Sequence, residues 1–175
     1  MTDLAPGAPI PADDPTRELT ISDPDGPNMR HVSVAGGAYT ILLTGAQTGG
    51  RYSLIDMYVP AGGGPPPHRH DFEEMFTILE GEIELTFRGE TRKAGAGVTV
   101  NIPANAPHAF KNKSDRPARL LCLCTPPGQE QFFIEVGVPV DSRTAPPPKL
   151  AATEQAAFIE RAKALSAKYR TELLR

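Results

Sequence analysis

Residues 62–81 read GGGPPPHRHDFEEMFTILEG, and this stretch decides the fold of the chain. His68 and His70 are two residues apart, so on a β-strand both side chains lie on one face, with Cα atoms about 6.5 Å apart. Glu74 has the same parity, but on a straight strand it would lie about 13 Å beyond His70. The three side chains can share one ion only if the chain turns a corner at residues 71–73. The stretch therefore predicts a bend as well as a metal site.

The residues after this corner favour a β-hairpin. Glu80 and Gly81 suit a two-residue turn, because glycine adopts positive φ without strain. The resulting register pairs Ile78 with Ile83, Phe76 with Leu85 and Glu74 with Phe87. Glu74 is then the only charged group on an apolar face, where an unpaired carboxylate would be costly or take up a proton. A cation beside Glu74 removes this cost, so the pattern itself indicates a metal.

The composition restricts the class of protein. The 175 residues suit one domain with tails, and 18 Lys and Arg against 21 Asp and Glu give a net charge of -3 without a basic cluster. Nucleic acid and membrane are therefore not expected as partners. Because no signal peptide or membrane-spanning run is visible, we predict a cytoplasmic protein. Cys122 and Cys124 lie in an apolar segment and are predicted to be buried, inert thiols.

Short runs rich in Val, Ile, Thr and Phe, separated by Gly and Pro, predict many short β-strands joined by turns over residues 29–140. The last of these strands is predicted at Phe132–Val138. Ala118–Thr125 is apolar on both faces, which is typical of a strand that is covered on both sides. This strand favours a homodimer.

The two ends of the chain differ from the barrel. Residues 1–28 contain six prolines and are predicted to be an extended arm. Residues 141–150 are a proline-rich linker. Residues 151–175 are predicted to form an amphipathic helix with Thr153 as N-cap, because apolar side chains recur at helical spacing: Phe158, Ala162, Leu165, Tyr169 and Leu173.

Two motifs together resemble the cupin superfamily. The first is Gly62-x5-His68-x-His70-x3-Glu74-x6-Gly81, and the second is Gly97-x5-Pro103-x-Asn105-x2-His108-x3-Asn112. Asn105 departs from the second motif, where the family has glycine, but asparagine tolerates a left-handed backbone. The resemblance implies a jelly-roll β-barrel of six to eleven strands with one metal ion.

By position in the motifs, the implied metal ligands are His68, His70, Glu74 and His108. Three neutral imidazoles and a carboxylate suit a divalent transition metal: Fe, Mn, Ni, Co, Cu or Zn. Four protein ligands leave two positions of an octahedral ion open. His31 lies outside the motifs, and Glu73, the rival carboxylate, faces outward by parity.

Aromatic side chains dominate the predicted interior. Phe76, Phe87 and Phe110 are expected to line a substrate pocket suited to a flat, largely apolar molecule with one or two oxygen ligands. The alternative is that these rings fill the bottom of a small barrel.

The resemblance extends to single-domain cupins of the quercetin dioxygenase type. It implies a metal-dependent dioxygenase that acts on a small aromatic or enolisable substrate, with Glu74 as the catalytic base for a phenol or enol proton. Two alternatives remain open. One is a non-catalytic cupin that binds a small molecule or has a regulatory role, and the other is a metal-dependent isomerase or decarboxylase.

Overall fold

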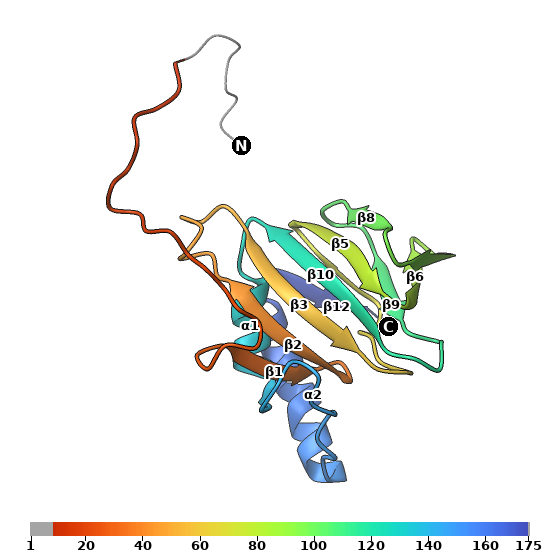
Figure 1. The fold of residues 1–175 in the computed structure, drawn as a ribbon. Helices are drawn as coiled ribbons and strands as arrows, with labels where there is room; N and C mark the ends of the chain where they lie inside the picture. The colour runs from red at the N-terminus through yellow and green to blue at the C-terminus, as the bar shows by residue number, and fades with distance from the viewer. Residues whose placement is uncertain (1–8, 175) are drawn as a thin grey trace.

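The computed structural model describes residues 9–174, which form two antiparallel β-sheets around one hydrophobic core (Figure 1). The core combines side chains of both sheets, for example Phe76 from one and Phe110 from the other. Residues 9–29 form no helix or strand. The start of this segment projects from the barrel, whereas Ser22 donates a hydrogen bond to the Leu42 carbonyl and Asp25 pairs with Arg143. The first eight residues of the predicted arm lie outside the described residues. The all-β prediction is confirmed. No helix among residues 9–174 is long and apolar enough to cross a membrane.

The larger sheet has seven strands in the order β11 (Val138–Pro139), β1 (Arg30–Val34), β2 (Gly37–Leu43), β3 (Ser53–Val59), β10 (Ala118–Thr125), β5 (Glu73–Glu80) and β8 (Thr99–Ile102). The smaller sheet has five strands in the order β12 (Thr171–Leu173), β4 (His68–His70), β9 (His108–Lys111), β6 (Glu82–Phe87) and β7 (Glu90–Gly95). Two helices, α1 (Gln129–Val136) and α2 (Ala152–Ser166), follow the barrel.

The predicted corner after the histidine pair is confirmed. β4 ends at His70, Asp71 and Phe72 form a bend, and β5 begins at Glu73. β4 belongs to the five-stranded sheet and β5 to the seven-stranded sheet. The bend therefore carries the chain from one sheet to the other, so Glu74 faces the histidines from the opposite side of the barrel.

The predicted hairpin register is wrong. β5 pairs with β10 and β8, whereas β6 pairs with β7 and β9, so Glu74 does not pair with Phe87. Gly81 (φ 71°) is a second crossing between the sheets, and a Cβ atom there would lie 2.6 Å from the Pro117 carbonyl oxygen. The predicted faces are still correct, because side-chain alternation is a property of each strand alone. The inward residues are buried: Glu74, Phe76, Ile78, Ile83 and Leu85.

The predicted strand at Phe132–Val138 is also wrong, because most of this segment belongs to α1. Phe132, Phe133 and Val136 are buried on one side of this helix. Their spacing fits one helical face, and the ring of Phe133 meets that of Tyr39 at 5.0 Å between centroids. Only Val138 and Pro139 are extended, as β11.

The C-terminal segment is only partly helical. The N-cap of α2 is Ala151, not the predicted Thr153. The helix ends at Ser166, whereas the prediction extended it to residue 175, which lies outside the described residues. The following residues turn back and form β12, which pairs with β4. Phe158, Ala162 and Leu165 pack against the core. Helix α2 contacts α1, and Figure 1 shows both helices at the same end of the barrel.

Candidate metal centre

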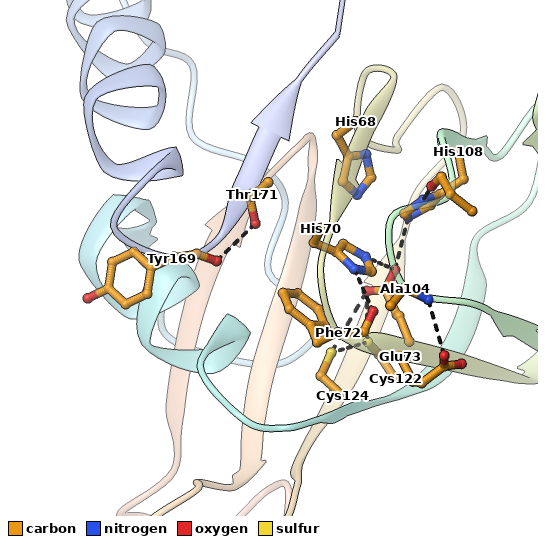
Figure 2. A network of polar contacts seen from close by, with 12 residues as sticks. His68, His70, Phe72, Glu73, Ala104, His108, Cys122, Cys124, Tyr169 and Thr171 are labelled. Atoms are coloured by element: carbon orange, nitrogen blue, oxygen red, sulfur yellow. Dashed lines mark hydrogen bonds and ion pairs between the residues drawn. The ribbon is translucent and has the colours of Figure 1, made fainter.

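The structure brings together the four side chains that the motifs single out. His68 and His70 come from β4, His108 comes from β9 directly opposite His68, and Glu74 comes from β5 of the other sheet. Their ligand atoms all lie within 4.8 Å of one another. Each of the four side chains is at most 7% exposed. Figure 2 shows the three imidazole rings converging.

Backbone carbonyls fix the orientation of all three imidazoles. Each ring donates its Nδ1–H to a nearby carbonyl at 2.9 Å: His68 to Pro66, His70 to Phe72 and His108 to Ala106. A carbonyl oxygen can only accept, so Nδ1 carries the proton of the neutral ring and Nε2 presents a lone pair. The three rings are therefore held in the tautomer that binds a metal through Nε2.

The centre of the cluster requires a positive charge. Nε2 of His70 and Nε2 of His108 each lie 3.1 Å from Oε2 of Glu74. In the neutral rings these are contacts between acceptors, which become favourable only when a proton or a metal ion lies between them. The donor set, three imidazole nitrogens and one carboxylate, fits a divalent transition metal.

The pKa shifts of the metal-free protein also indicate that the cluster requires a positive charge. Burial opposes ionisation of Glu74, but the hydrogen bonds from His108 and His70 outweigh it and hold the pKa of the carboxyl well below its usual value. Burial also opposes charge on His108, yet the Glu74 carboxylate raises the pKa of this histidine. Burial, together with the neighbouring His108, lowers the pKa of His68 to about 4. His68 is therefore neutral and ready to bind a metal over the physiological pH range.

The second carboxylate oxygen of Glu74 faces two thiols. Oε1 lies 3.4 Å from Sγ of Cys122 and 3.9 Å from Sγ of Cys124, and the two sulfurs are 3.6 Å apart. Burial raises the pKa of the Cys122 thiol well above its usual value, so this thiol keeps its proton and can donate it to Oε1. The predicted burial of both cysteines is confirmed. Their contact with Glu74 was not predicted.

The corner between β4 and β5 supports the cluster from outside. The ring of Phe72 stacks on that of His70, with centroids 3.8 Å apart and an angle of 4°. Glu73 accepts hydrogen bonds from Asn101 Nδ2 (2.9 Å) and from the Ala104 backbone N–H (3.1 Å), so it points away from the histidines (Figure 2). Asn105 has φ 68°, the left-handed conformation expected from the second motif.

An apolar cavity of about 340 Å³ opens onto this cluster. Its walls include His68 and Glu74 together with Phe76 and Phe110, whose rings meet edge to face at 5.2 Å. Phe87 does not belong to its lining residues. It packs against the edge of the core instead, with the Arg88 guanidinium over its ring.

The outer part of the cavity comes from residues after the barrel. Both helices and β12 contribute walls: Gln129, Phe132, Phe133, Phe158, Thr171 and Leu173. Some of these residues have a signal in the sequence, because Gly128 and Gly137 flank apolar residues at helical spacing. The contribution of β12 has no local signal, since it depends on pairing with β4.

The comparisons with known proteins agree with this geometry. Residues 55–124 match the cupin domain. Quercetin 2,3-dioxygenase of Bacillus subtilis is 30% identical over 109 residues, which are 62% of this chain and 32% of that protein. Dimethylsulfoniopropionate lyase DddQ of Ruegeria pomeroyi is 41% identical over 68 residues, which are 38% of this chain and 33% of that protein. The chain thus spans about a third of the length of both relatives.

Among solved structures, an RmlC-like cupin from Shewanella frigidimarina superimposes with a TM-score of 0.52 at 15% identity. The match covers 61% of this chain and 91% of that chain. This likeness concerns the fold alone. The fold is an all-β double-stranded β-helix, and residues 55–124 are similar to the cupin domain.

Proposed function

We propose that this protein is a metal-dependent dioxygenase that acts on a small aromatic or enolisable substrate, in the manner of a quercetinase. The observation that carries the proposal is the cluster of three histidines and one glutamate at the wall of an apolar, aromatic cavity. The partial similarity to a quercetin dioxygenase supports this direction.

His68, His70, Glu74 and His108 would hold one divalent transition metal. When bound, the ion would act as a Lewis acid that lowers the pKa of a phenol or enol oxygen and offers open coordination positions. The carbonyl contacts of the three Nδ1 atoms fix the orientation of the imidazoles and leave each Nε2 to face the ion.

Glu74 is the proposed proton acceptor. It lies at the cavity wall, and its Oε2 lies 3.1 Å from Nε2 of His70 and of His108. The metal-free pKa of this carboxyl is low because of the histidines. An apolar substrate that fills the cavity removes water and raises the pKa of a buried carboxyl, which makes Glu74 a better base in the complex.

The rest of the cavity orients the substrate and excludes water. Phe76 and Phe110 provide flat apolar surfaces next to the cluster. Tyr39 also lines the cavity. Burial raises the pKa of its phenol above the usual value, so the phenol remains protonated. A flat substrate with few charges fits this lining best.

The test begins with elemental analysis of protein purified without chelator or added metal. Oxygen consumption is then measured with flavonols, catechols and β-diketones, for the unmodified protein and for Glu74→Gln. We expect consumption that requires both the metal and Glu74. If the metal-loaded protein binds these compounds but consumes no oxygen, the dioxygenase proposal fails. The result would then favour a cupin that binds a small molecule or has a regulatory role. Turnover without oxygen would instead indicate an isomerase or decarboxylase.

We also propose that two copies of the chain associate through the outer face of β10. Leu121 and Leu123 lie on this face, half-buried, and Leu123 is opposite Leu54 on one side and Met75 on the other. This apolar strip would be covered by the same strip of a second copy. Sedimentation of a compact monomer at micromolar concentration would contradict the proposal.

A further inference from the structure

Gln129 is a buried polar residue whose hydrogen bonding is incomplete. It is the first residue of α1, is 4% exposed, and its Oε1 has no hydrogen-bond partner among residues 9–174. An unpaired buried acceptor destabilises the folded protein. Such groups are rare in folded proteins, and each one calls for an explanation.

The neighbouring residue shows that this end of α1 can satisfy buried polar groups. Glu130 is also buried, but its carboxylate accepts backbone N–H groups of Gly45 (2.9 Å) and Gly128 (2.8 Å). Glu130 therefore joins α1 to the barrel. Gln129 makes no comparable contact through its Oε1, so the cost of burying this oxygen is not offset within the described part of the chain.

The position of Gln129 suggests what offsets the cost. The residue lines the same cavity as His68 and Glu74. Around it the wall is apolar, with Phe132 and Phe133 from α1 and Phe158 from α2. Oε1 itself is fully buried, so the amide group must turn toward the cavity to meet a bound molecule. There it would offer one of the few polar groups of a largely apolar wall, which is the arrangement that gives a pocket its specificity.

We propose that Gln129 Oε1 accepts a hydrogen bond from a hydroxyl group of the substrate, separate from the oxygen that meets the metal. The substrate would then be a flat phenol or enol with at least two hydroxyl groups, one at the metal centre and one at α1. The proposal rests on the proposed function only for the metal-binding end of this molecule. Gln129 is a specificity-determining residue, because an analogue without the second hydroxyl leaves its buried oxygen unpaired.

Binding to the Zn(II)-loaded protein tests the proposal without turnover. The probes are 3-hydroxyflavone, which offers a metal-binding hydroxyketone, and a set of its derivatives with one additional hydroxyl at different ring positions. We expect at least one derivative to bind about 10- to 100-fold more tightly than 3-hydroxyflavone, in line with one buried hydrogen bond. Gln129→Leu should abolish this preference and leave the affinity for 3-hydroxyflavone within about threefold.

Gln155→Leu is the matched control. Gln155 lines the same cavity from α2 but is exposed, so its replacement should leave the preference intact. A preference that survives Gln129→Leu, no preference for any derivative, or no binding of any flavone would each overturn the proposal.

A second measurement does not depend on a ligand. In the protein without ligand, Gln129→Leu removes an unpaired buried oxygen, so the melting temperature should rise, whereas a clear fall would show that the amide has a structural partner and overturn the proposal. Neither measurement involves oxygen consumption. The hydroxyl preference can therefore hold in a protein that is no dioxygenase, and oxygen consumption without this preference would refute the role of Gln129 alone.

Discussion

The two sheets hold their parts of the metal centre in different ways. The five-stranded sheet supplies His68, His70 and His108, and each imidazole is fixed by a backbone carbonyl. The seven-stranded sheet supplies Glu74, and the free oxygen of its carboxylate faces the side chains of Cys122 and Cys124. Backbone contacts survive most side-chain substitutions, whereas thiol contacts do not. The carboxylate side of the centre is therefore the one that mutation can adjust.

The largest effect is expected on the histidine side. His108→Ala removes a proposed ligand and should lower metal affinity by more than about 1000-fold, because even the loss of an outer contact to a ligand costs about 10- to 100-fold. The affinity can be measured by competition with a chelator. His31→Ala is the control, since His31 contacts Thr40 outside the cluster. Equal metal content in both variants would remove His108 from the set of ligands.

A smaller loss is expected on the carboxylate side. Glu74→Gln keeps the shape of the side chain but removes its charge, so we expect metal affinity to fall about 100-fold. Glu73→Gln is the adjacent control, and it should retain the metal because Glu73 contacts Asn101 and Ala104 instead. Loss of metal in Glu73→Gln but not in Glu74→Gln would show that Glu73, and not Glu74, binds the metal.

The third prediction concerns pH and separates two histidines of the same sheet. Glu74 raises the pKa of His108, so in the metal-free protein this ring holds a proton at higher pH than an ordinary histidine. The metal must displace that proton, and its affinity should fall about tenfold for each pH unit below this pKa. His68, with a pKa of about 4, adds a second proton only at much lower pH.

Zinc competition titrations between about pH 5 and pH 8 check this slope. In His108→Ala the slope over this range should become shallower, because one proton fewer has to be displaced. An affinity that stays constant from about pH 8 to pH 5 in the unmodified protein would contradict the coupling of His108 to Glu74.

The smallest effect is expected from the thiol that supports Glu74. Cys122→Ala removes the donor to Oε1 and should weaken metal binding about tenfold, as is usual for an outer contact of a ligand. Cys122→Ser keeps a donor at this position and should recover part of the loss. If the alanine and serine variants bind metal equally well, the thiol contributes packing alone and the two sheets do not differ as described.

Strand faces could be predicted from the sequence, but strand partners could not. Alternation is local, so the inward position of Glu74, Phe76 and Ile83 followed from parity even though the assumed hairpin was wrong. Partner choice depends on distant strands, and Gly81 proved to be a crossing between sheets. The segment at Phe132–Val138 was misjudged because a short apolar run fits a strand as well as a helix.

The difference between local patterns and contacts between distant residues also applies to the candidate site. The motifs singled out four residues, and the structure brings these four together. Cys122 is 48 residues from Glu74 along the chain, and Gln129 lies on a helix that was expected to be a strand. Their relation to the cluster arises from tertiary packing, so no local spacing could indicate it.

The strand β12 has a consequence for the rate of ligand binding. It has three residues and pairs with β4, with Thr171 opposite His70 and Leu173 opposite His68. Thr171 and Leu173 also form part of the cavity wall. A short edge strand is among the parts of a fold that open at low free-energy cost. If ligands enter through this opening, their association rate should level off at high ligand concentration, at the rate at which β12 leaves β4.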